Sequence, residues 1–216
     1  AVSIAANGKT TKFELNGGTI SDNVGRAGGA VIIRSVNCEF KMTGGEIKNN
    51  SVTTFDLDAT SPTKKGQGGA VWMGNGSFVM EGGKISSNKA ETKYGSGGAV
   101  YVNGGTCTMQ GGEITGNTAA FNSGNNGGGG GILVAGGTCT IKGTASVSSN
   151  KATTQEGGGV CVTGGTFSLQ GGTISSNEAK AGGGGLSVNG SGATVTISGG
   201  AISNNIAQYG AGMMVR

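Results

Sequence analysis

The chain has no histidine among its 216 residues. This absence excludes His-based catalytic triads, histidine general bases and histidine-ligated zinc sites. Aspartate is also scarce, because only Asp22, Asp56 and Asp58 occur, and none of the four cysteines has the CxxC spacing of a redox or zinc motif. We therefore expect a protein with no cofactor, no metal ion and no enzymatic activity.

Charge and long apolar runs are lacking as well. Only 12% of the residues are charged and the net charge of +4 is scattered, so we expect no nucleic-acid partner. No run of about 18 apolar residues exists, so we expect no direct membrane insertion of this segment. Proline occurs once and glycine 49 times without a Gly-X-Y period, which excludes collagen. The abundance of Gly, Ser, Thr and Asn suits a protein that is secreted or lies on the bacterial cell surface.

The chain is built from a repeat. Residues 157–177 (GGGVCVTGGTFSLQGGTISSN) align without a gap with residues 97–117 (GGAVYVNGGTCTMQGGEITGN), and 12 of 21 positions are identical. Each copy contains three short patterns, F-x-L/M, I-x-x-N and G-G-A/G-V-x-V. The Ile or Val that opens I-x-x-N recurs at intervals of 27, 38, 29, 33, 27 and 28 residues.

This spacing predicts the fold. A period of about 20–50 residues is typical of solenoids, and apolar alternation at every second residue indicates strands. One repeat cannot bury its apolar face alone, so the copies must stack, and parallel crossovers are right-handed by strong preference. The sequence predicts one all-β domain over residues 1–216, a right-handed parallel β-helix of the pectin-lyase-like kind with about seven turns of roughly 27–38 residues.

Glycine and asparagine are expected at the corners. Glycine adopts positive φ without a Cβ clash, and the Asn that closes I-x-x-N suits either the left-handed region or side-chain bonds to the backbone. Seven stacked Asn could form a hydrogen-bonded ladder along one corner. The alternative is that Asn is only a tolerated turn residue.

Length variation is confined to one corner, between the Asn and the next Gly-Gly. The longest inserted loop spans residues 51–67 and contains the only proline, and residues 89–96 and 118–128 form moderate insertions. Such loops gather on one edge, where solenoids often bind partners. Both termini fall within the V-x-V pattern without a polar cap, so we expect adjoining β-helix turns of a longer parent chain as neighbours.

The GGAV motifs at residues 28–31, 68–71 and 97–100, with the seven I-x-x-N motifs, resemble the chlamydial polymorphic membrane proteins. That family carries GGA-I/L/V and FxxN motifs on a β-helical passenger domain, and here Ile or Val stands in place of the Phe. The resemblance implies autotransporter-like display on the cell surface and adhesion to host cells.

The middle residue of each V-x-V pattern should point away from the core. We call these residues the outer column, and most are apolar or aromatic: Ile32, Trp72, Tyr101, Leu133, Cys161, Ser187 and Met214. A ligand-binding strip is predicted from this column and the neighbouring loops. Its candidate residues are Trp72, Tyr101, Leu133, Phe55, Tyr94 and Phe121. The alternative is that the loops fold over the column and bury it.

Three further patterns each have a plain structural alternative. A Thr-x-Thr array on the outward face of the F-x-L strands suits ice binding, but Thr is also favoured on exposed strands. Asp56 and Asp58 could hold calcium, although that ion needs more oxygen ligands than one pair supplies. Cys107 and Cys139 should lie on successive turns, either as stacked free thiols or as a disulfide.

The functional prediction is a non-catalytic, adhesin-like segment that binds a host glycan or surface protein. One alternative is a purely structural stalk or spacer. The others are a carbohydrate-active lyase or hydrolase, which share this fold, and an ice-binding face.

Overall fold

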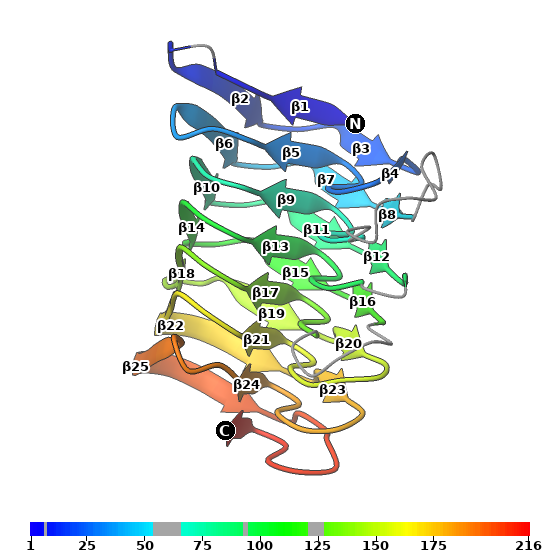
Figure 1. Ribbon diagram of the computed structural model, residues 1–216, viewed down its shortest axis with the longest axis vertical. Helices are drawn as coiled ribbons and strands as arrows, with labels where there is room; N and C mark the ends of the chain where they lie inside the picture. Colours follow the sequence, from blue (N-terminus) through cyan, green and yellow to red (C-terminus); the bar gives the residue numbers. More distant parts are fainter. Residues whose placement is uncertain (7, 54–65, 93–94, 121–127) are drawn as a thin grey trace.

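The computed structural model describes the chain except residues 7, 54–65, 93–94 and 121–127. Within the described part every regular element is a β-strand, and the strands of successive turns pair in parallel. Figure 1 shows the turns stacked along one axis, with the two termini at opposite ends. The prediction of an all-β parallel β-helix of about seven turns is confirmed.

The V-x-V patterns form the first sheet. In this sheet each strand pairs with its equivalents one turn before and one turn after. The strands, in spatial order, are β1 (Val2–Ile4), β5 (Val31–Ile33), β9 (Val71–Met73), β13 (Val100–Val102), β17 (Ile132–Val134), β21 (Val160–Val162), β24 (Leu186–Val188) and β26 (Met213–Val215).

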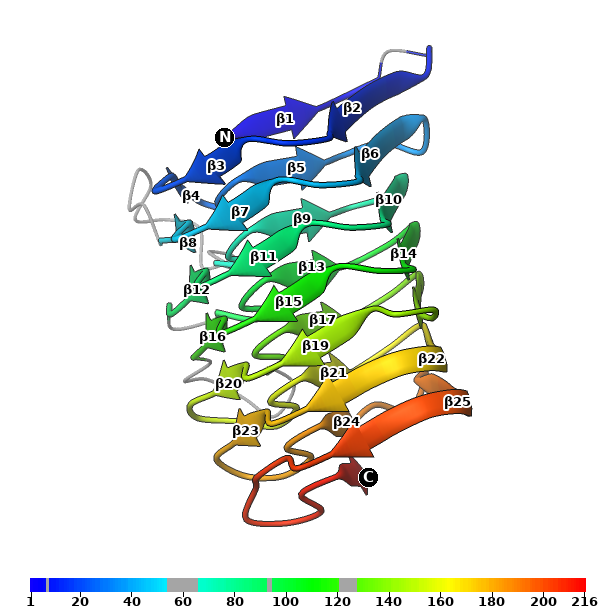
Figure 2. The ribbon, with the colours of Figure 1, turned by 180° about the vertical axis from the view of Figure 1, so that it is seen from behind.

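The F-x-L and I-x-x-N patterns belong to one sheet of twelve strands rather than to two separate faces. The F-x-L strands are β2 (Thr11–Leu15), β6 (Cys38–Met42), β10 (Ser77–Met80), β14 (Thr106–Met109) and β18 (Thr138–Ile141). The I-x-x-N strands are β3 (Thr19–Ser21), β7 (Glu46–Lys48), β11 (Lys84–Ser86), β15 (Glu113–Thr115) and β19 (Ser146–Ser148). Both patterns join across the Gly-Gly in β22 (Thr166–Ser175) and β25 (Thr194–Ser203). Figure 2 shows these two long strands curving around the back of the molecule.

A third sheet of six two-residue strands directly follows the Asn corner, and the sequence patterns did not predict it. Its strands are β4 (Val24–Gly25), β8 (Ser51–Val52), β12 (Lys89–Ala90), β16 (Thr118–Ala119), β20 (Lys151–Ala152) and β23 (Glu178–Ala179). Its second position is usually a small residue, and Ala90, Ala119 and Ala152 are buried there. The chain thus turns inward again immediately after each Asn.

Inward side chains stack in columns along the axis. Phe40 lies between Phe13 and Phe78, with ring centroids 5.3 Å and 4.9 Å away. Ile47 and Ile85 of the I-x-x-N column are fully buried and directly paired. Each repeat therefore supplies one layer of a continuous core, as the alternation predicted.

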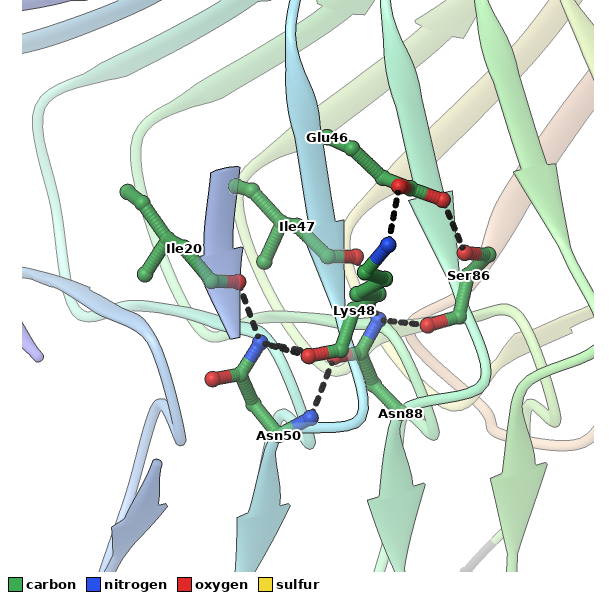
Figure 3. Close-up of polar contacts among 7 residues, drawn as sticks. All are labelled: Ile20, Glu46, Ile47, Lys48, Asn50, Ser86 and Asn88. Atoms are coloured by element: carbon green, nitrogen blue, oxygen red, sulfur yellow. Dashed lines mark hydrogen bonds and ion pairs between the residues drawn. The ribbon is translucent and has the colours of Figure 1, made fainter. Parts of the chain in front are cut away.

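The asparagines do form a ladder along the corner, which confirms that prediction. The side-chain Nδ2 of each Asn donates to Oδ1 of the Asn one turn further on at 2.9–3.0 Å, and its backbone N–H donates to the same oxygen. Nδ2 also donates to the carbonyl oxygen of an Ile or Val in the preceding turn, as Figure 3 shows for Asn50 with Ile20. Asn88 makes the same bond to Ile47. The ladder consists of Asn23, Asn50, Asn88, Asn117, Asn150, Asn177 and Asn205.

The left-handed residue of each corner is not the Asn itself but the residue before it. Asn49, Ser87 and Ser149 have φ of 55–56°, and Gly116 takes this place in the fourth turn with φ of 65°. This residue changes the direction of the backbone, so that the ladder Asn after it can direct its side-chain amide along the axis. Small or polar residues tolerate that backbone conformation best.

Candidate functional site

The outer column is assembled by direct pairing of β9, β13, β17 and β21. Tyr101 lies opposite Trp72 on one side and Leu133 on the other, and Leu133 is followed by Cys161. Apolar contacts join Tyr101, Leu133 and Cys161 into a satellite cluster on which Trp72 and Ala135 pack. The fold therefore brings together the three strip residues that belong to the column. The loop residues Phe55, Tyr94 and Phe121 lie outside the described residues.

The expectation that this column faces solvent is wrong for most of its length. Tyr101 is 6% exposed, Leu133 2% and Cys161 1%, whereas Trp72 is half-buried. Part of the cover is the first glycine of the Gly-Gly corner: a Cβ added to Gly157 would lie only 2.6 Å from Cβ of Cys161. The burial of these side chains favours the alternative of a covered column. The inserted loops that this alternative places over it lie largely outside the described residues.

The phenol of Tyr101 contacts the side chain of Gln67. Burial raises the pKa of its phenol, and a hydrogen bond with the side chain of Gln67 opposes that shift. Gln67 itself forms parallel bridges with Ala27 and Ser96, its equivalents in the neighbouring turns. A fourth line of backbone contacts therefore runs along the axis beside the column. Tyr101 is buried next to this line rather than exposed.

Glu156 is a buried acid that the sequence patterns did not single out. Its carboxylate is almost inaccessible at 3% residue exposure, accepts a hydrogen bond from Ser187 Oγ at 2.8 Å and pairs with Arg216 at 2.6 Å. The sequence contained one indication of its importance. Glu156 directly precedes a Gly-Gly, at the position that Gln67 and Ser96 occupy in other turns. Because Ser187 is fully buried, its hydroxyl is not accessible to a substrate.

All four cysteines are buried free thiols, which confirms the stacked-thiol prediction for Cys107 and Cys139. A hydrogen bond with the Cys107 thiol, together with burial, raises the pKa of Cys139 well above its usual value. Burial and the nearby Glu156 carboxylate raise the pKa of Cys161 to about 12. These thiols act as small apolar core residues at neutral pH.

The high pKa of Cys161 predicts alkaline instability. The folded state favours the neutral thiol, so its contribution to the free energy of unfolding is complete below pH 9 and is lost as the pH rises toward 12. We expect Cys161→Ala to lose stability less steeply above pH 9, by up to about 1.4 kcal/mol per pH unit. Urea titrations of both proteins between pH 7 and 10.5 measure this, and equal slopes would contradict it.

The outward face of the twelve-stranded sheet carries different residue types in its first turns and in its later turns. Its first turns carry paired charges, such as Lys48 with Glu46 at 2.9 Å and Lys84 with Glu113 at 3.9 Å. Hydrogen bonds from Lys48 and Ser86 lower the pKa of Glu46, as the geometry in Figure 3 indicates. These charges form an exposed ladder of ion pairs along the first turns.

The later turns of this face carry the Thr-x-Thr array. Its first-position residues are in register from turn to turn: Thr106, Thr138, Thr166 and Thr194. Their side chains are exposed or half-buried, so the regular hydroxyl array exists as the sequence predicted. Ice binding by this array stays a prediction.

Side chains that could bind a metal ion do not gather in the described part of the chain. No group of three or more Cys, Asp or Glu side chains there could share a metal ion, and Asp56 and Asp58 lie outside that part. No helix among the described residues is long and apolar enough to cross a membrane. Comparisons with protein families, with curated proteins and with solved structures find no match for this chain.

Proposed function

We propose that this chain is a rigid, non-catalytic rod of a bacterial surface or secreted protein, and that its main role is to space other parts of that protein. The observation that carries the proposal is the Asn ladder, which runs without a break from Asn23 to Asn205. The ladder and the bonds between strands are both directed along the axis. A force applied along the rod would therefore be shared by three sheets and the ladder in every turn.

Two further observations support this role. The outer column, the most apolar stripe outside the core, is largely covered, so it offers little free surface to a ligand. The resemblance of the GGAV and I-x-x-N motifs to the chlamydial polymorphic membrane proteins supports a position at the cell surface. Display there suits a stiff element more than a flexible linker.

Native-state hydrogen exchange tests the rigidity. For a spacer we expect the amides of the central strands, from β10 to β20, to exchange through one common opening whose free energy equals that of global unfolding. Mass spectrometry across a series of low urea concentrations measures this. Independent opening of single turns at much lower free energy would argue against a rigid rod.

Adhesion to a host glycan or surface protein is the second candidate, and the half-buried Trp72 favours it. Its indole lies at the uncovered end of the satellite cluster and close to Gly74, where an added Cβ would approach the ring to 2.6 Å. An aromatic face of this kind suits sugar or protein contacts. The spacer role alone predicts no ligand.

A binding screen against glycans and host matrix proteins separates the two candidates. If Trp72 binds a ligand, Trp72→Ala abolishes the binding with unchanged circular dichroism. Ile32→Ala is the matched control, because Ile32 is the half-buried neighbour of Trp72 in the same column, and this variant should bind normally. Binding that survives Trp72→Ala would contradict adhesion through this residue.

A further inference from the structure

The corner that follows β9 brings three unlike side chains together. β5, β9 and β13 are consecutive strands of the first sheet (Figure 1), and backbone bonds extend their pairing by one residue beyond each strand. The N–H of Gly74 donates to the carbonyl oxygen of Ile33 at 2.8 Å. The N–H of Asn103 donates to the carbonyl oxygen of Met73 in the same way, also at 2.8 Å. Arg34, Gly74 and Asn103 are therefore equivalent positions of successive turns, about 4.8 Å apart.

The indole of Trp72 lies between these positions. A Cβ added to Gly74 would lie 2.6 Å from Cη2 and 2.7 Å from Cζ3 of the ring, and 3.5 Å from the carbonyl oxygen of Arg34. The benzene end of the indole therefore occupies the place that a side chain of residue 74 would take, between the chains of the neighbouring turns. Because Gly74 has no side chain, the half-buried ring lies against backbone and keeps part of its surface exposed.

The two flanking side chains, Arg34 and Asn103, are both exposed. Nε of Arg34 donates to Oγ of Ser3 at 3.3 Å, while its terminal amino groups meet no acceptor within the described chain. The side-chain amide of Asn103 likewise makes no hydrogen bond to a described residue. The corner thus offers a ligand one aromatic ring, one guanidinium and one amide.

Arg34 determines the charge of this face. From β1 to β24, the middle residue of each first-sheet strand and the residue two places after it point outward. Among these described positions Arg34 is the only one with a charged side chain, and it forms no ion pair with a described residue. A single guanidinium suits a single carboxylate, which it can bind through two parallel hydrogen bonds, whereas a densely sulfated ligand requires a cluster of cations.

We infer that Trp72, Arg34 and Asn103 form a binding site for an acidic glycan, one in which single sugar units carry a carboxylate. The apolar face of one sugar ring would stack on the exposed part of the indole. The carboxylate of that unit or of its neighbour would pair with Arg34, and Asn103 would bond to a sugar hydroxyl. This inference rests on the second candidate function, adhesion through Trp72.

The shape of the site favours a sugar over a protein as the ligand. A protein interface has an apolar core of several side chains within a polar rim. Here one aromatic ring has polar groups on both sides along the axis, and its apolar neighbours Tyr101 and Leu133 are buried. One ring of this kind matches the area of one sugar unit.

Calorimetric titration of the intact chain with two carboxylated oligosaccharides, a hyaluronan tetrasaccharide and sialyllactose, tests the inference. We expect saturable binding of at least one of them. Its carboxyl-reduced form, in which a neutral alcohol replaces each carboxylate, should bind about tenfold more weakly, because the charge-assisted bonds to Arg34 are lost. Added salt should weaken the binding of the charged form only.

Protein variants locate the carboxylate. Arg34→Gln should weaken binding of the carboxylated sugar about tenfold and leave the affinity for its carboxyl-reduced form unchanged, because that form has no charge to pair. Arg26→Gln is the matched control: it removes the same charge from another exposed arginine, which lies beside β4 of the third sheet, and both affinities should stay unchanged. Trp72→Ala should abolish the binding of both forms while circular dichroism stays unchanged.

These titrations can contradict the inference without contradicting adhesion itself. Equal binding of the carboxylated and carboxyl-reduced sugars, lost in Trp72→Ala, would leave adhesion through Trp72 intact and overturn the acidic-glycan site. Equal losses in Arg34→Gln and Arg26→Gln would also overturn it, because net charge would then explain the affinity. If neither oligosaccharide binds, the inference is wrong, and the broader screen of glycans and matrix proteins decides separately whether Trp72 binds another ligand.

Discussion

Replacing Asn117 with alanine is expected to lower the free energy of unfolding by roughly 3–5 kcal/mol, because each buried polar group left without a partner costs about 1–3 kcal/mol. Oδ1 of Asn117 accepts the backbone N–H and Nδ2 of Asn88, and its Nδ2 donates to the carbonyl oxygen of Ile85 at 3.0 Å. Both asparagines are fully buried, so water cannot replace the lost side chain. Urea denaturation followed by circular dichroism measures the change.

The same substitution at the end of the ladder is the matched control. Asn205 makes the equivalent bonds to Asn177 and Ile174, but it is half-buried and open to solvent on one side. Water can satisfy the groups that Asn205→Ala exposes, so we expect a cost of about 1 kcal/mol or less. A cost of about 1 kcal/mol or less at both positions would show that the ladder adds nothing beyond a tolerated turn residue.

Replacing Gly98 with alanine is expected to prevent two turns from stacking, at a cost above the roughly 1–3 kcal/mol typical of overpacking. An added Cβ would lie 2.1 Å from the carbonyl oxygen of Gly130 and 2.7 Å from the carbonyl carbon of Thr118. Both obstacles are backbone atoms held by inter-turn pairing, so no side chain can move aside. We expect loss of the cooperative unfolding transition, or a large fall in its midpoint, in thermal and urea denaturation.

Gly17→Ala is the control for this prediction. An added Cβ at Gly17 meets nothing within 4 Å, and its φ lies outside the left-handed region. The substitution should change the free energy of unfolding by no more than about 1 kcal/mol. A mild effect at both positions would mean that neighbouring turns can separate to admit a methyl group.

The repeat predicted the main features of the fold because each is local or strictly periodic. Alternating apolar residues such as Phe40 and Met42 must share one face of a strand, and identical spacing brings equivalent residues together. The ladder follows from the same periodicity, since Asn88 and Asn117 occupy one position in successive turns. The two glycines of GGAV also have distinct local reasons: Gly97 has φ of 64°, whereas Gly98 needs the space of the missing Cβ.

The candidate site was less predictable because its exposure depends on contacts between turns and the segments that cross them. Alternation indicates that Tyr101 and Leu133 point away from the core, but it does not reveal that both side chains are nevertheless buried. Glu156 was missed for a similar reason, since its partners Ser187 and Arg216 are 31 and 60 residues away in sequence.

The sequence by itself determined the repeating unit, its strands and their stacking, because a short repeat with one apolar face can bury that face only against its own copies. Only the tertiary structure decided which outward residues meet solvent. It buries Tyr101 and Leu133 of the predicted strip and leaves Trp72 half-buried. The physical reason is that burial on the outside of a solenoid depends on contacts made by the corners and connecting segments, and strand periodicity contains no information on those contacts.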